Sequence, residues 1–97
     1  MDDEKRILIF SACYNEKDNI KKLISGIRKN LPLCSILIMD DNSPDQTKEI
    51  VKKLQSTDSQ LHLIIREKKL GLDTAHKFAY NFALKNNYDY LITMDAD

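Results

Sequence analysis

Acidic side chains stand in close pairs directly after two of the apolar runs in the sequence. The pairs are Asp40-Asp41 and, two positions apart, Asp95 and Asp97. Alternate residues of an extended segment point to the same side, so Asp95 and Asp97 can share one ion. Their hard oxygen atoms suit Mg²⁺ or Mn²⁺, ions that usually bind substrate phosphates as well. The spacing therefore predicts a divalent metal site, although solvated acids in a turn would have the same pattern.

The pair Asp40-Asp41 allows two interpretations. The segment Ser43-Pro44-Asp45-Gln46 follows it and has the pattern of a helix start, with Ser43 as the N-cap and Gln46 completing a capping box. Because Ser43 already serves as the cap, the two acids are available to accept hydrogen bonds from a nucleobase or a ribose. In the alternative interpretation Asp40 and Asp41 only help to start the helix that follows.

Other polar residues follow the first and third apolar runs. Tyr14 has a ring that would stack on a base or pack locally. Residues 12–18 contain no glycine, so a backbone phosphate nest of the dinucleotide type is not expected. Arg66, Lys68 and Lys69 precede Gly71, and they either meet diphosphate oxygens or are solvated loop charges.

Several other kinds of chemistry lack support. His62 and His76 have no nucleophile or metal ligand at motif spacing, which argues against a catalytic triad. Cys13 and Cys34 form no CxxC or Cys/His cluster, so both are expected to be free thiols. The 15 Lys and Arg residues balance 15 Asp and Glu residues, which excludes a general attraction to nucleic acid.

The elements that position these residues follow from the hydrophobic periodicity. Apolar runs predict strands at residues 6–12, 35–39, 61–65 and 90–94, and helical spacing predicts helices at 20–31, from Ser43 to about 54, and at 75–85. This alternation predicts an α/β domain with a mainly parallel sheet of about four strands and three helices, of the Rossmann-like kind. Ligands of such sheets bind beyond the carboxyl ends of the strands, where the acids would repel each other unless a cation lies between them.

The apolar runs are far shorter than the roughly 20 residues that a membrane span needs. The start Met1-Asp2-Asp3-Glu4 is acidic and does not have the cationic region of a signal peptide. We therefore expect a cytoplasmic location, at the cytosolic face of a membrane in a longer form of the protein.

Four segments together resemble the motifs of inverting family-2 glycosyltransferases. The resemblance is closest to the polyprenyl-phosphate sugar transferases, the group that includes dolichyl-phosphate mannose synthase. Tyr14-Asn15-Glu16 is similar to the first motif of that group, residues 40–47 to its DDGSPDGT motif, residues 69–75 to its KxGLGTA loop, and Met94-Asp95-Ala96-Asp97 to its DxD motif. The departures include Ala12-Cys13 in place of Pro-Thr, and Asn42, Gln46 and Asp73 in place of glycines.

The resemblance implies a GT-A fold, of which residues 1–97 form the amino-terminal nucleotide-sugar-binding part, truncated at the DxD motif. It implies a UDP- or GDP-sugar donor, Mg²⁺ or Mn²⁺, and transfer with inversion to an acceptor such as polyprenyl or dolichyl phosphate. Catalytic residues are expected downstream of Asp97, so the 97 residues alone are expected to be inactive. The implied metal ligands are Asp95 and Asp97, and the implied nucleotide-sugar contacts are Ala12, Tyr14, Glu16, Asp40, Asp41, Lys69 and Asp95.

Two other readings of the sequence remain open. One is a non-catalytic α/β module that binds a nucleotide or a protein. The other is a receiver-like or phosphatase domain that uses Asp40-Asp41, which fits poorly because these acids follow the second strand.

An exposed last strand would invite pairing with a second copy of the chain, because its unpaired backbone groups can bind another strand.

Overall fold

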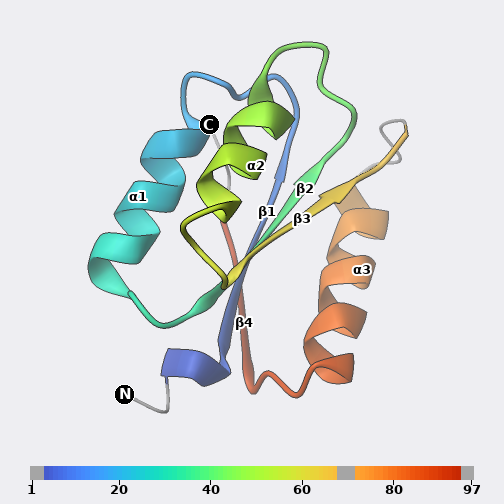
Figure 1. The fold of residues 1–97 in the computed structure, drawn as a ribbon. Helices are drawn as coiled ribbons and strands as arrows, with labels where there is room; N and C mark the ends of the chain where they lie inside the picture. The colour runs from blue at the N-terminus through green and yellow to red at the C-terminus, as the bar shows by residue number, and fades with distance from the viewer. Residues whose placement is uncertain (1–3, 68–71, 95–97) are drawn as a thin grey trace.

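The computed structural model describes residues 4–67 and 72–94, apart from the side chains of residues 72 and 73. Strands and helices alternate as the sequence predicts (Figure 1). The elements are η1 (Glu4–Arg6), β1 (Ile7–Cys13), α1 (Ile20–Asn30), β2 (Ser35–Asp40), α2 (Thr47–Gln55), β3 (Leu61–Ile65), α3 (Leu72–Lys85) and β4 (Tyr90–Thr93). No helix in this described part of the chain has the length and apolarity that crossing a bilayer requires.

The four strands form one sheet in the order β3-β2-β1-β4, and every neighbouring pair is parallel. This confirms the predicted parallel sheet. The register sets Cys13 opposite Asp40 and Asp40 opposite Ile65. The carboxyl ends of β1, β2 and β3 therefore meet at one edge, and the residues that follow them become neighbours.

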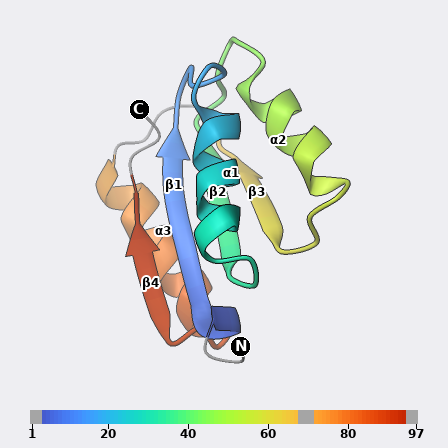
Figure 2. The same cartoon turned by 90° about the vertical axis from the view of Figure 1, so that its left-hand side faces the viewer.

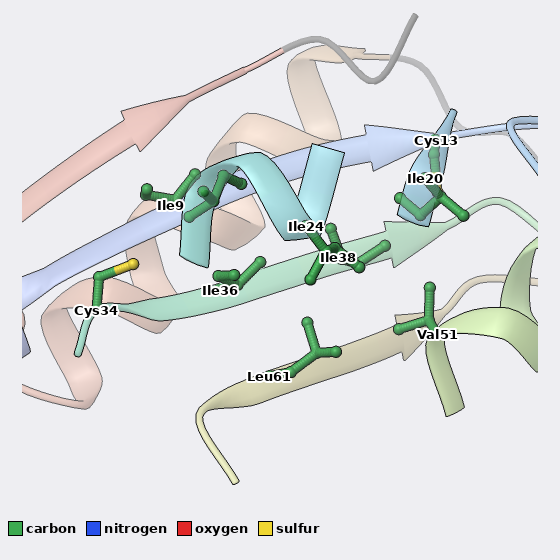
Figure 3. Packing of buried hydrophobic residues seen from close by; sticks show 10 residues of the cluster. Ile9, Cys13, Ile20, Ile24, Cys34, Ile36, Ile38, Val51 and Leu61 are labelled. Atoms are coloured by element: carbon green, nitrogen blue, oxygen red, sulfur yellow. The ribbon is translucent and has the colours of Figure 1, made fainter. Parts of the chain in front are cut away.

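Helices cover both faces of the sheet. α1 and α2 lie on one face and α3 on the other (Figures 1 and 2). On the first face, isoleucines of β1, β2 and α1 pack with Val51 and Leu61 (Figure 3). On the second face, Ala75 and Ala79 of α3 pack against large side chains of β1 and β2. All six residues of β2 are buried, as expected for a central strand covered on both faces.

The start of α2 differs from the prediction. The helix begins at Thr47 after Gln46, rather than at Pro44 after a Ser43 cap. Ser43 has other partners: its hydroxyl donates to Asp40 and accepts the backbone N–H of Asn15 at 2.9 Å. Because one contact reaches the end of β2 and the other reaches the loop after β1, the Ser43 side chain supports the edge of the sheet instead of capping the helix.

An ion pair ties the elements together at the opposite, amino-terminal edge of the sheet. Arg28 at the end of α1 donates to both carboxylate oxygens of Asp58, at 2.6 and 3.1 Å, and to the carbonyl oxygen of Cys34 at 2.6 Å. The hydrogen bonds from Arg28 hold the pKa of Asp58 below its ordinary value. This group joins α1 to the segments that lead into β2 and β3.

Candidate functional site

Two loops at the carboxyl edge of the sheet are fastened together by backbone amides. The loop after β1 presents three successive N–H groups, and each donates to a side chain of the turn after β2 or of the first residue of α2. We call these three bonds the amide latch. They run from Asn15 to Ser43 at 2.9 Å, from Glu16 to Thr47 at 3.0 Å and from Lys17 to Asp45 at 3.2 Å. Both loops therefore have one fixed arrangement relative to each other.

Asp40 binds Ser43, one of the three acceptors of the amide latch, from the interior of the protein. Its side chain is fully buried, and it accepts the Ser43 N–H at 3.0 Å together with the Ser43 hydroxyl. The Cys13 thiol is directed at the same carboxylate, with Sγ 3.9 Å from Oδ1. These contacts give Asp40 a role within the turn, and direct contact with a nucleotide sugar stays a prediction for this residue.

Asp41 forms an ion pair with the end of β3. Arg66 donates from Nε to Oδ1 at 2.6 Å and from Nη2 to Oδ2 at 2.8 Å, while its Nη1 donates to the Thr74 hydroxyl at 2.8 Å. The Asp41 and Arg66 side chains are only 7% and 12% exposed. Asp40 and Asp41 are thus stabilised by hydrogen bonds and a cation of the protein itself, so their proximity does not by itself require a metal ion.

Three further predicted site residues lie at the end of β1, which contains Ala12, and in the loop that follows, which contains Tyr14 and Glu16. Tyr14 is 42% exposed, and Ala12 and Glu16 are half-buried. The Glu16 carboxylate accepts the Asn19 side-chain amide at 3.2 Å. An aromatic ring, a small residue and an acid therefore lie at the same edge as Asp41, which is a combination suited to a base and its sugar.

The turn after β2 explains one departure from the family pattern. Asn42 has a φ of 58°, in the left-handed region that glycine enters easily and that asparagine tolerates better than most residues. Its side-chain amide also donates to the Glu67 carbonyl at 3.1 Å and accepts Lys48 Nζ at 3.1 Å. Asparagine thus keeps the backbone conformation of a glycine and adds contacts on both sides of the turn.

The predicted metal ligands Asp95 and Asp97 and the predicted phosphate contact Lys69 lie outside the described residues. Among residues 4–67 and 72–94, no group of three or more His, Cys, Asp or Glu side chains is arranged to hold a metal ion. Glu16, Asp40 and Asp41 all have protein donors, as given above. Carboxylates after β4 would be suitable hard ligands.

Sequence reasoning missed two features of the site. The first is the amide latch, because the sequence indicates Asp45 as part of a helix start and Thr47 only as the end of the motif at residues 40–47. The second is the Asp41–Arg66 pair, because Arg66 was assigned to diphosphate or solvent. A signal for the pair exists once the strand order is known: Asp40 opposite Ile65 makes Asp41 and Arg66 neighbours.

Cys13 lies at this edge but is expected to be unreactive. Burial, with the nearby charges of Asp40 and Glu16, raises its pKa to about 12, and only the thiolate attacks alkylating agents. In a Cys34→Ser variant we expect iodoacetamide to label native Cys13 at least about 100-fold more slowly than the unfolded chain at pH 8. The native rate should still rise about tenfold per pH unit up to pH 10. A rate that levels off near pH 9 would contradict the raised pKa.

Comparisons with known proteins show a family and a fold for the chain. The model of the family described as Glycosyl transferase family 2 matches residues 8–97. Polyprenol monophosphomannose synthase of Mycolicibacterium smegmatis is 32% identical over 94 residues, which are 96% of this chain and 36% of that protein. Undecaprenyl-phosphate mannosyltransferase of Micrococcus luteus is 32% identical over 92 residues, which are 95% of this chain and 38% of that protein. The chain thus spans well under half the length of these curated relatives.

A solved structure has the same fold. It is the mannosyltransferase PcManGT from Pyrobaculum calidifontis in complex with GDP-Man and Mn²⁺, with a TM-score of 0.70 and 21% sequence identity. The likeness covers 79% of this chain and 24% of that one. It shows that the four-stranded sheet with its three helices has the GT-A, Rossmann-like arrangement that the sequence predicts.

Proposed function

Because the chain belongs to glycosyl transferase family 2, with residues 8–97 matched, we propose that these residues bind the nucleotide of a nucleotide-diphospho-sugar in a glycosyltransferase. The observation that carries the proposal is the meeting of Tyr14, Glu16 and Asp41 at the carboxyl edge of a parallel sheet. The ring of Tyr14 would stack on the base, and the acids would accept hydrogen bonds from the base and ribose.

The proposed donor is GDP-mannose and the proposed acceptor a polyprenyl phosphate. The names of the two relatives and of the solved mannosyltransferase complex support this choice. A lipid-phosphate acceptor would place the reaction at the cytosolic face of a membrane. Pairing of two copies through β4, the outer strand of the sheet, stays a prediction. The 43% exposure of Ile92 on that strand supports it.

The proposed reaction is a direct displacement. An acceptor phosphate oxygen forms a bond to the anomeric carbon, while the bond from that carbon to the diphosphate breaks on the opposite face and the nucleoside diphosphate leaves with the electron pair. A bound divalent ion, held by Asp95 and Asp97, would stabilise the negative charge on the departing diphosphate. The described residues hold the nucleoside, so that the sugar is presented in one orientation to the acceptor.

The test is calorimetric titration of GDP, UDP and ADP into the full-length protein, with Mn²⁺ and with EDTA. We expect GDP to bind at least about tenfold more weakly with EDTA and in Asp95→Ala, because the ion contacts the diphosphate. Asp89→Ala is the matched control, since Asp89 pairs with Arg6 at the other edge of the sheet and its loss should leave binding unchanged. Transfer from radiolabelled GDP-mannose to polyprenyl phosphate then tests the acceptor.

The relative affinities of the three nucleotides decide between the proposed donor, another donor and a non-catalytic module. Stronger binding of UDP than of GDP would keep the nucleotide-sugar site and replace the proposed donor. A folded protein that binds none of the three nucleotides would overturn the proposal and favour the non-catalytic α/β module.

A further inference from the structure

We infer that Arg66 is a positioning residue that fixes the carboxylate of Asp41 and thereby sets the selectivity of the site among nucleobases. The inference rests on the proposed function, because it concerns how the same site reads its nucleotide. It goes beyond it by assigning base selectivity to a residue that does not itself need to touch the ligand. Three observations carry it: the two-pronged ion pair, its burial, and its links to neighbouring elements.

The two-pronged pair removes the rotational freedom of Asp41. Arg66 donates to both oxygens, at 2.6 and 2.8 Å, so the plane of the carboxylate must match the plane of the guanidinium group. The Asp41 N–H also donates to the Cys13 carbonyl at 3.2 Å. Backbone and side chain of Asp41 are therefore both held in place.

The fixed carboxylate retains acceptor capacity. A carboxylate has about four lone-pair positions, and Arg66 takes one on each oxygen. A remaining position can accept one N–H group from a ligand at a defined point in space. The rings of guanine and uracil carry an N–H group between carbonyl or amino substituents, whereas the six-membered rings of neutral adenine and cytosine carry none. An acceptor held in place thus favours GDP or UDP over ADP.

Arg66 itself is anchored from two more directions. Its backbone N–H donates to the Asp40 carbonyl at 2.8 Å, which continues the β2–β3 ladder. Its Nη1 donates to the Thr74 hydroxyl in α3 at 2.8 Å. β2 thus holds the Arg66 backbone and α3 holds its guanidinium group, so the arginine defines where the carboxylate lies. Lysine would keep the charge but has no planar fork to make the paired contacts.

The chain contains a matched control at the other edge of the sheet. Arg28 and Asp58 form a similar two-pronged pair, at 2.6 and 3.1 Å, with both side chains 20% exposed. Loss of either arginine removes a charge and leaves a partly buried aspartate without its cation. Only Arg66 adjoins the proposed base pocket, so the two variants separate a loss of stability from a loss of selectivity.

The experiment measures the Kd values of GDP, UDP and ADP with Mn²⁺ for the full-length wild type and for Arg66→Gln, Arg66→Lys, Asp41→Asn and Arg28→Gln. The reference is whichever of GDP and UDP binds the wild type more tightly, and the preference is the Kd of ADP divided by the Kd of this reference. We expect Arg66→Gln to lower the preference about tenfold, mainly because the reference nucleotide binds more weakly. Arg66→Lys should lower it by about threefold. Arg66→Gln combined with Asp41→Asn should lose little more than either change alone, because the two residues act as one unit.

The control variant Arg28→Gln separates an effect on stability from an effect on selectivity, and three results would contradict the inference or the proposed function. Arg28→Gln should lower the free energy of unfolding while leaving the preference over ADP unchanged. If folded Arg66→Gln keeps the wild-type preference, the inference is wrong while nucleotide binding stands. If Arg66→Gln does not fold, an unchanged preference in Arg66→Lys overturns the inference equally. If the wild type binds none of the nucleotides, the proposed function itself fails.

Discussion

Asp40→Ala is expected to lower the free energy of unfolding by about 3 kcal/mol, because it leaves the buried N–H and hydroxyl of Ser43 without their acceptor. Both residues are at most 2% exposed, so water cannot easily take the place of the carboxylate. Removing a buried negative charge offsets part of this loss. Urea unfolding at pH 7 measures the difference, and loosening of the turn should accompany it.

The matched control for this prediction is Asp45→Ala in the same turn. Asp45 also accepts two backbone N–H groups, from Lys17 at 3.2 Å and from Thr47 at 3.0 Å, together with the Thr47 hydroxyl, but it is only half-buried. Water can replace it there, so its loss should cost about 1 kcal/mol. Equal costs for the two variants would show that burial of Asp40 does not govern its contribution.

Asp58→Asn is expected to lower the free energy of unfolding by about 2 kcal/mol at pH 7, because it replaces two charge-assisted hydrogen bonds from Arg28. The hydrogen bonds from Arg28 lower the pKa of Asp58 in the folded protein. The stabilisation is therefore complete above the ordinary aspartate pKa of about 3.9. It is lost as the pH falls through the lower pKa of the folded state.

The test of this prediction is the difference between wild type and Asp58→Asn in urea unfolding, followed from pH 7 down to pH 2. The difference should stay constant to about pH 4 and then decrease toward zero, because the protonated wild-type residue resembles asparagine. A difference that is the same at every pH would show that the cost comes from shape rather than from charge. A difference that grows on acidification would contradict the sign of the pKa shift.

Most of the fold could be predicted because its signals are local. The apolar runs gave β3 at Leu61–Ile65 and the other strands to within one residue of each bound, and the stripe from Ile20 gave α1. The parallel order followed from the alternation of strands and helices. Local signals failed where distant groups compete for a side chain. Ser43 has the type and place of a helix cap, but Asp40 and Asn15 bind it instead.

The candidate site was predicted as a set of residues and not as a set of contacts. Ala12 lies at the end of β1, and Tyr14, Glu16 and Asp41 follow their strands, so the strand ends alone bring the four residues to one edge. The partner of Asp41 is 25 residues away, and only the register of β2 with β3 shows that the two meet. Charge alone therefore suggested repulsion between acids where the structure has an ion pair.

The amide latch has a consequence for the kinetics of hydrogen exchange. Its three N–H groups belong to an open loop, yet their acceptors lie 28 to 31 residues further along the chain. Local fraying cannot release them without also separating the loops that follow β1 and β2. Their deuterium uptake should therefore be slow and should follow the opening of the β1–β2 pair rather than that of a surface loop. The proposed nucleotide site would then assemble only when the centre of the sheet has formed, which makes exchange at residues 15–17 a direct reporter of an intact site.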